Sequence, residues 1–99
     1  MALPGGIRQV MWWVFAGSRG GANRIRIVKE LIKRPYNAHQ LAKAIGLDYK
    51  TVRHHLNVLS RNGLVVMVGE DYGGMYFPSP SLEANIGEMD DIIKKVGFG

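Results

Sequence analysis

The strongest constraint on the fold of this 99-residue chain is a tight corner between two helices in residues 37–62. Asn37 and Gln40 stand three residues apart, which is the capping-box pattern of a helix start. Gly46 can supply the left-handed residue that ends this helix, and Asp48 can cap a second helix immediately afterwards. The connection is too short to hold anything other than a helical corner.

Small and apolar residues complete this corner. Ala42 is small enough to let the two helices approach, and Val52, ten residues later, fills the space between them. Gly63 then stops the second helix. Together with the turn at Gly46, this spacing predicts a helix-turn-helix unit over residues 37–62.

Apolar spacing and turn-forming residues predict the elements on either side of this unit. Asn23 can cap a helix that Pro35 ends, and the spacing of its apolar residues directs Val28, Leu31 and Ile32 to the core. The glycine-rich loop before this helix is interpreted as a hinge rather than as a phosphate-binding loop. The predicted elements are helices at residues 7–16, 23–33, 38–45, 48–62 and 80–96, and a wing hairpin at 64–78 with strands at 64–68 and 75–77.

The charges are divided unevenly along the chain. Residues 1–63 carry eleven Lys or Arg and two Asp or Glu, a net charge of +9, whereas residues 64–99 carry two basic and six acidic side chains, a net charge of −4. Such a division directs the basic part toward a polyanion and the acidic part away from it. Nucleic acid is therefore the leading candidate partner.

The composition argues against several other classes of protein. The absence of cysteine excludes disulfides, thiolate zinc sites and cysteine nucleophiles, and it fits a reducing cytoplasm. The longest apolar run, Val10–Ala16, is far shorter than the roughly 20 residues that cross a bilayer, and a buried helix explains it better than a secretory signal. The acidic cluster of Glu88, Asp90 and Asp91 is interpreted as a solvated helix face. We therefore expect no membrane segment, no enzymatic activity and no cofactor.

Residues 24–66, with the stretch 48–56 at their centre, resemble archaeal winged helix-turn-helix regulators of the arsenical-resistance-repressor (ArsR) type. The resemblance implies a mainly α fold (α+β) in the order α-α-α-α-β-β-α. A length of 99 residues is about that of one ordinary domain, so residues 1–99 are expected to form a single domain. The resemblance also implies a cytoplasmic, homodimeric transcription regulator that binds double-stranded DNA sequence-specifically, with residues 48–62 as the recognition helix in the major groove.

The histidines depart from the family pattern or carry no metal signal. His55 stands where helix-turn-helix units often have an apolar residue, and we interpret it as a histidine at the edge of the core with a hydrogen-bond partner. His54 and His55 are adjacent, so they cannot chelate one metal as an i, i+4 pair would. The metal-sensing relatives use a last helix with cysteines or a carboxylate and histidine set, and residues 80–99 contain neither cysteine nor histidine. No metal site is expected.

A helical wheel separates the two faces of the predicted recognition helix. Val52, Leu56 and Leu59 define the core direction, and the polar residues lie on the opposite face or at its flanks. The first turns of such a helix read base edges, whereas its later residues lie nearer to phosphates. The predicted DNA-binding residues are Lys50, Thr51, Arg53 and His54 for bases, Asn57 and Arg61 for phosphates, and His39 and Lys43 on the preceding helix.

The first and last helices are expected to form the dimer interface. The apolar stripe of residues 80–96 is longer than one helix needs to cover a core this small, so it should pair with residues 7–15 across a two-fold axis. Trp12 and Trp13 are interpreted as dimer packing rather than as a ligand pocket. The predicted interface residues are Val10, Trp13, Val14, Ile86, Met89 and Ile93.

The tip of the predicted wing leaves a second function open. Glu70 and Asp71 lie where many wings present Arg or Lys to phosphate, so either the wing stands off DNA or only its glycines approach it. Winged helices also serve as protein-binding modules without sequence-specific DNA binding, and the fold does not decide between the two. The basic segment favours DNA.

Overall fold

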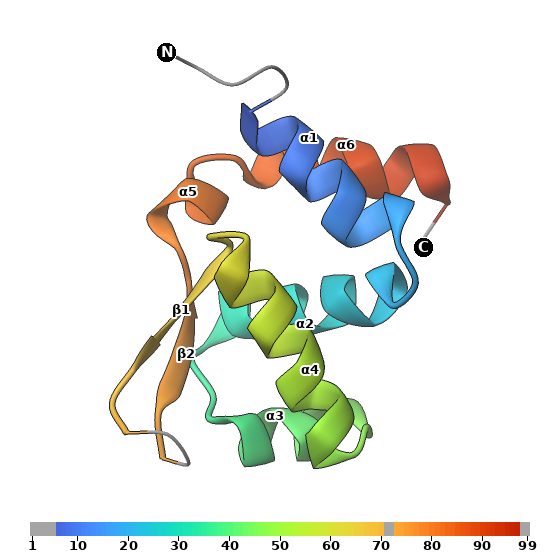
Figure 1. The fold of residues 1–99 in the computed structure, drawn as a ribbon. Helices are drawn as coiled ribbons and strands as arrows, with labels where there is room; N and C mark the ends of the chain where they lie inside the picture. The colour runs from blue at the N-terminus through green and yellow to red at the C-terminus, as the bar shows by residue number, and fades with distance from the viewer. Residues whose placement is uncertain (1–5, 71–72, 98–99) are drawn as a thin grey trace.

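The structure, a computed structural model, describes residues 6–70 and 73–97. Figure 1 shows α1 and α6 side by side at one end of the molecule, with α3, the start of α4 and the lower end of the hairpin at the other. The fold is a winged helix-turn-helix: mostly helical, with a small antiparallel sheet of two strands. The elements are α1 (Gly6–Trp12), the π-helix η1 (Trp13–Gly17), α2 (Gly21–Lys33), α3 (Ala38–Ile45), α4 (Tyr49–Arg61), β1 (Val65–Val68), β2 (Met75–Pro78), α5 (Pro80–Glu83) and α6 (Ile86–Val96).

The predicted helical corner is confirmed in its details. The Asn37 side chain accepts a hydrogen bond from the Gln40 amide at 2.8 Å, and the Gln40 side chain accepts one from the Asn37 amide at 2.9 Å. Gly46 has a φ of 72°, the left-handed conformation that ends α3. Asp48 then caps α4 by accepting from the Thr51 amide at 3.0 Å. These caps fix the angle at which α4 leaves α3.

The hairpin is tied to the rest of the fold at its base. β1 and β2 pair in antiparallel register from Val65 opposite Pro78 to Val68 opposite Met75, close to the predicted strands. On its other edge, β2 forms a single bridge in which the Tyr76 amide donates to the Tyr36 carbonyl at 2.8 Å. Ser79, directly after β2, is buried and donates its hydroxyl to the Gly63 carbonyl at 2.6 Å. The wing therefore has a fixed base.

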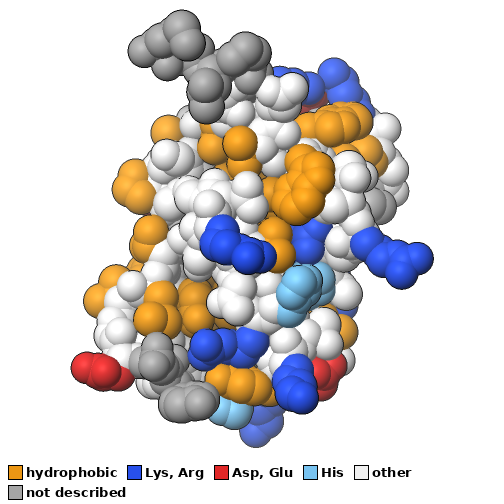
Figure 2. Space-filling view, viewed as in Figure 1, with side chains coloured by type: hydrophobic (Ala, Val, Ile, Leu, Met, Phe, Trp, Pro, Cys, Tyr) orange, Lys and Arg blue, Asp and Glu red, His pale blue; other side chains and the backbone are white. Residues whose placement is uncertain are grey.

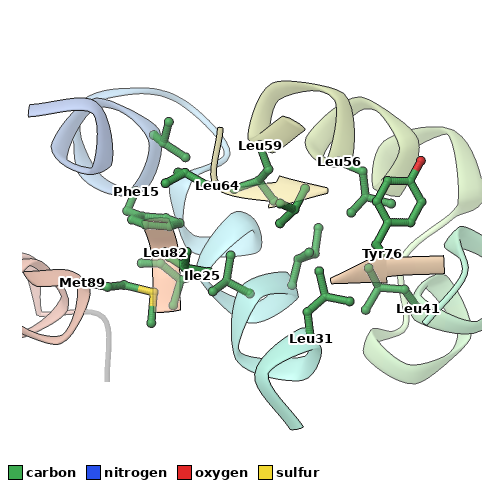
Figure 3. Close-up of a cluster of buried hydrophobic side chains, with 14 of the residues drawn as sticks. Phe15, Ile25, Leu31, Leu41, Leu56, Leu59, Leu64, Tyr76, Leu82 and Met89 are labelled. Atoms are coloured by element: carbon green, nitrogen blue, oxygen red, sulfur yellow. The ribbon is translucent and has the colours of Figure 1, made fainter. Parts of the chain in front are cut away.

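The core runs continuously from the layer formed by α1 and α6 to the helix-turn-helix unit. Figure 3 shows Phe15, Leu82 and Met89 at one side of this cluster and Leu41, Leu56 and Tyr76 at the other, with Leu59 and Leu64 between them. The three α4 residues predicted to face the core are fully buried, namely Val52, Leu56 and Leu59. The wheel therefore assigns the buried face of α4 correctly.

The start of α2 differs from the prediction. Asn23 was expected to cap this helix, but α2 begins at Gly21, and Gly20 takes the N-cap position with a φ of 87°. Glycine accommodates this left-handed backbone without strain. Ile32, predicted to face the core, is 45% exposed, because Ile25, Ile27, Val28 and Leu31 form the buried side of α2 and Ile32 lies outside it.

The predicted helix at residues 80–96 is two helices. α5 ends at Glu83, and Asn85 has a φ of −128° and a ψ of 28°, which lies outside the helical region. The Asn85 side chain donates to the Ser81 carbonyl at 2.8 Å, and its own carbonyl accepts from the Glu88 amide. Asparagine favours such local bonds over a continuous helix. The predicted helix at 7–16 is also modified, because α1 continues into the π-helical turn η1.

Candidate nucleic-acid interface

The outer face of α4 is polar and basic. Lys50, His54, Asn57 and Arg61 are all exposed, on the side of the helix opposite the buried leucines. Figure 2 shows Lys, Arg and His side chains gathered over the lower half of the molecule, around α4. The predicted exposure of these four side chains is confirmed. Their contact with DNA stays a prediction.

Thr51 and Arg53 flank this face and take part in the start of α4. The Thr51 hydroxyl donates to Asp48 Oδ1 at 2.6 Å, so its proton is used within the cap. This bond and the bond from the Thr51 amide lower the pKa of Asp48 and keep its carboxylate charged. Arg53 donates from Nη1 to the Tyr49 hydroxyl at 3.2 Å, and its guanidinium carbon lies 5.8 Å from the centre of the Tyr49 ring.

An aromatic stack spans the corner between α3 and α4. The rings of His39 and Tyr49 lie nearly parallel, with centroids 4.0 Å apart and planes inclined by 14°. His39 is exposed, as expected, and the exposed Lys43 follows it one turn later on α3. Tyr49 was missed by the sequence reasoning, although its place directly after the Asp48 cap puts it at the first turn of α4. The stack holds the α3 residues beside the start of the recognition helix.

Arg24 is buried rather than part of the basic surface. It is 2% exposed, and its Nε donates to the Val14 carbonyl at 2.9 Å. Its Nη2 donates to the Arg19 carbonyl at 2.9 Å and to the Ser18 hydroxyl. Nη1 lies 3.2 Å from Nδ1 of His55. The sequence reasoning counted Arg24 among the charges facing a polyanion, and burial removes it from that count.

His55 occupies the position predicted for it, at the edge of the core with a hydrogen-bond partner. It is 6% exposed, and Leu56 fills the core beside it as expected. Burial lowers the pKa of His55, and the positive charge of Arg24 and the proximity of His54 lower it further. The imidazole is therefore neutral at pH 7.

The acidic cluster of α6 is partly paired and not a freely solvated face. Arg8 of α1 donates from Nη2 to Asp91 at 2.7 Å and also binds Glu88. The hydrogen bond from Arg8 lowers the pKa of Asp91. Asp90 is exposed, in agreement with the prediction. These ion pairs tie α1 to α6 and leave Arg8 less available to a polyanion.

The predicted dimer residues divide into buried and accessible groups. Val14, Met89 and Ile93 are at most 8% exposed and pack in the core of one protomer, so they are not surface residues available to a second copy. The predicted pairing of residues 7–15 with the last helix occurs inside one chain, between α1 and α6. Val10 and Ile86 are half-buried and Trp13 is 50% exposed. The neighbouring Trp12 is also exposed.

The wing presents no basic side chain. Residues 64–78 contain neither Lys nor Arg, and Glu70 is exposed near the tip. Asp71, the second acidic residue predicted there, lies outside the described residues. Val66, Met67 and Val68 are exposed along β1. Residues 64–78 therefore carry no positive side chain that could attract a DNA phosphate.

The described part of the chain holds neither a cluster of metal ligands nor a membrane-spanning helix. No group of three or more His, Cys, Asp and Glu side chains in residues 6–70 and 73–97 is arranged to hold a metal ion. No helix in the same ranges is long and apolar enough to cross a membrane.

Comparison with known proteins places this fold among winged helix-turn-helix proteins of the ArsR and MarR type. Residues 22–66 match the family model described as bacterial regulatory protein, arsR family. That segment contains α3, α4 and nearly all of α2, and ends in β1. The chain is therefore ArsR-like in its helix-turn-helix segment. A search of curated proteins found no match.

Solved structures resemble the whole fold at low sequence identity. The transcriptional regulator HlyU from Vibrio vulnificus is 21% identical over 85% of this chain and 84% of its own, with a TM-score of 0.67. The homodimeric winged helix-turn-helix DNA-binding domain of a possible ArsR-family regulator from Mycobacterium bovis is 17% identical over 89% and 79%, also with a TM-score of 0.67. Staphylococcus aureus MarR, in complex with salicylate and kanamycin, is 14% identical over 76% of this chain, with a TM-score of 0.64. The chain spans 53% of that MarR chain.

Proposed function

We propose that this protein is a sequence-specific DNA-binding transcription regulator that acts as a homodimer and places α4 in the major groove of double-stranded DNA. The observation that carries the proposal is the face of α4 formed by Lys50, His54, Asn57 and Arg61, which is exposed while the opposite face is locked in the core. A rigid helix with such a face fits the major groove. The match of residues 22–66 to the arsR family model supports the same role.

Residues at the start and at the end of α4 would contact different parts of the DNA. Lys50, Arg53 and His54 belong to its first turns and would read base edges, whereas Asn57 and Arg61 would lie nearer to phosphates. Thr51 would contribute mainly through the Asp48 cap, because its hydroxyl proton is donated there. His39 and Lys43 would contact the backbone from α3. In this proposal residues 1–99 act as one domain in the cytoplasm, and no enzymatic step or cofactor is involved.

Base reading by α4 can be tested after a bound sequence has been selected from a random pool of duplexes. His54→Ala and Arg53→Ala should each cost about 1 to 3 kcal/mol on the selected site and much less on random duplex, because base contacts carry the discrimination. Lys94→Ala, which removes an exposed cation from α6, is the matched control and should leave the ratio unchanged. If both α4 variants keep the wild-type ratio of specific to random binding, this helix does not read sequence.

The homodimer would use the exposed side of the layer formed by α1 and α6. Trp12 and Trp13 are 42% and 50% exposed there, and aromatic side chains of this size dominate the energetics of protein interfaces. A two-fold axis through this end of the molecule would leave both α4 helices free to face DNA. The exposed tryptophans therefore replace the buried Val14, Met89 and Ile93 as the main proposed contacts.

Trp12→Glu should convert the dimer to a monomer in sedimentation, because the change would bury a charge in the apolar interface. Ile32→Glu is the matched control, since Ile32 is 45% exposed on α2, away from this layer, and should leave the dimer intact. A dimer that survives Trp12→Glu would contradict the assigned surface. Ile93→Glu would be less informative, because Ile93 is buried in the protomer and the change would also test folding.

A protein-binding module without sequence-specific DNA binding remains the second candidate. The observation that favours it is the wing, which exposes Val66, Met67 and Val68 and carries no cation. A mobility shift with random duplex separates the two candidates, because a basic DNA-binding face binds any duplex at low salt whereas a protein-binding wing does not.

A further inference from the structure

Arg24 joins three parts of the fold through one side chain. It belongs to α2, and its guanidinium donates to the carbonyl of Val14 in η1 and to the loop that follows η1. The remaining contact, with Nδ1 of His55 at 3.2 Å, reaches the middle of α4. The Nδ1 edge of the His55 ring therefore connects the proposed recognition helix to the corner between η1 and α2.

The hydrogen-bond partners of the Arg24 guanidinium are neutral acceptors, and its carbon lies 6.0 Å from the centre of the Trp13 ring. They are two backbone carbonyls, the Ser18 hydroxyl and the imidazole of His55, and no acidic side chain in residues 6–70 and 73–97 forms an ion pair with Arg24. A buried cation that loses one acceptor pays a desolvation penalty that a surface cation does not. The contact with His55 is therefore sensitive to the state of the imidazole.

This geometry fixes the protonation state of His55. A guanidinium can only donate, so Nδ1 of His55 must accept, and the imidazole is neutral with its proton on Nε2. A proton on Nδ1 would place two donors and two positive charges face to face at 3.2 Å. The contact packs closely against Gly20, where an added Cβ would lie only 2.6 Å from Cε1 of His55 and 3.2 Å from Nη1 of Arg24.

We propose that the Arg24–His55 contact is a proton-sensitive latch, which holds α4 against the corner between η1 and α2 while His55 is neutral and releases it when His55 is protonated. The open latch loosens the contact of α4 with this corner at His55 and its neighbour His54, while Val52, Leu56 and Leu59 keep the helix in the core. The consequence for DNA binding rests on the proposed function, but the latch itself does not.

The groups that face His55 all oppose its protonation. From α2 it meets the Arg24 charge, from its own helix it meets His54, with ring centroids 5.4 Å apart, and the loop after η1 offers its acceptors to Arg24. Burial of the imidazole, followed by the charge of Arg24 and the proximity of His54, holds the pKa of His55 below its ordinary value of 6.5. The unfolded chain therefore binds this proton more readily, so the unfolding free energy should be full above about pH 7 and fall as the pH drops through 6.5 toward the folded pKa.

The latch can be tested on the free protein by NMR titration between about pH 8 and pH 5. Ring nitrogen shifts should show His55 as the Nε2–H tautomer at neutral pH, taking up its proton below the ordinary histidine pKa of 6.5. At that pH the Nη1–H protons of Arg24, which face Nδ1 of His55, should lose their protection from solvent exchange, measured relative to the exposed Arg19. If the Arg24 signal keeps its protection while His55 is protonated, the latch is excluded.

His55→Gln supplies a variant that keeps the acceptor and removes the titration. Its side-chain carbonyl can accept from Nη1 of Arg24, so the Arg24 Nη1–H protons should stay protected across the whole pH range. His54→Gln, which alters the exposed neighbour, should keep the pH-dependent loss but move it to higher pH, because His54 no longer opposes protonation of His55. A loss of protection in His55→Gln at the same pH would contradict the latch, because no proton then enters position 55.

DNA affinity provides a separate second readout, by fluorescence anisotropy on the same duplex and over the same pH range. Position 55 is the only difference between the two proteins, so every other effect of pH is common to both. The wild type should weaken relative to His55→Gln by about tenfold once the latch is open in nine molecules of ten. Equal pH profiles for the two proteins would contradict the latch. Absence of DNA binding by both proteins at neutral pH would contradict the proposed function instead, and the NMR titration then decides the latch.

Discussion

Gly21→Ala is expected to lower the unfolding free energy by about 3 kcal/mol. A Cβ at this position would lie 2.3 Å from the carbonyl oxygen of Phe15 and 2.7 Å from its carbonyl carbon. These are backbone atoms of η1, so they cannot move aside as the end of a flexible side chain can. The alanine would push the start of α2 away from η1 and loosen the core around Phe15, which is fully buried.

Gly87→Ala is the matched control for this substitution. Gly87 lies in the first turn of α6, and a Cβ there meets nothing within 4 Å. Alanine is the better helix former by up to about 1 kcal/mol, so this variant should be equal to the wild type or more stable. Chemical denaturation followed by circular dichroism measures both. A denaturation midpoint for Gly21→Ala that equals that of Gly87→Ala would contradict the close approach of η1 and α2.

The helix-turn-helix corner could be predicted from the sequence because its signals are local. The Asn37 capping box, the left-handed Gly46 and the Asp48 cap each act within four residues, and each is present in the structure. The two faces of α4 could also be predicted, because a 3.6-residue period fixes which side chains share a side. The candidate site therefore rests on the part of the fold that the sequence specifies most directly.

The remaining errors concern contacts between residues far apart in the chain. Arg24 meets His55 across 31 positions, and Arg8 meets Asp91 across 83, so a count of charges does not reveal that one is buried and the other paired. Val14 was assigned to an interface because an apolar stripe does not say whether its own chain or a second copy covers it. Two sequence features could have pointed to the contact between Arg24 and His55. They are the Gly20–Gly21 pair and a histidine at a position of α4 that is usually apolar.

The burial of Arg24 and the ion pairs of Arg8 reduce the number of cations available to DNA, and this number sets the expected dependence of binding on salt. With Arg24 buried and Arg8 bound to α6, the cations of α3 and α4 remain for the proposed DNA face, and the exposed Arg26 binds the Ile45 carbonyl at the end of α3. A dimer of this kind would neutralise about 6 to 10 phosphates, and log K should fall with log salt by about 0.9 for each. Binding should therefore weaken by about 10³ to 10⁵ between roughly 50 and 200 mM salt. Titration of fluorescent duplex across a salt series measures the slope.

Two substitutions separate the contributions of α4 and the wing to that slope. Arg61→Ala removes an exposed cation near the end of α4, so it should weaken binding to specific and random duplex alike and flatten the slope by about one unit for each phosphate that Arg61 neutralises.

Glu70→Lys reverses the charge near the wing tip and should strengthen binding to both duplexes if the tip approaches the backbone, because it replaces repulsion by attraction. Unchanged affinity in Glu70→Lys would place the wing tip away from DNA. A weaker affinity would mean that the carboxylate makes a favourable contact, and a salt slope unaffected by Arg61→Ala would remove the end of α4 from the proposed interface.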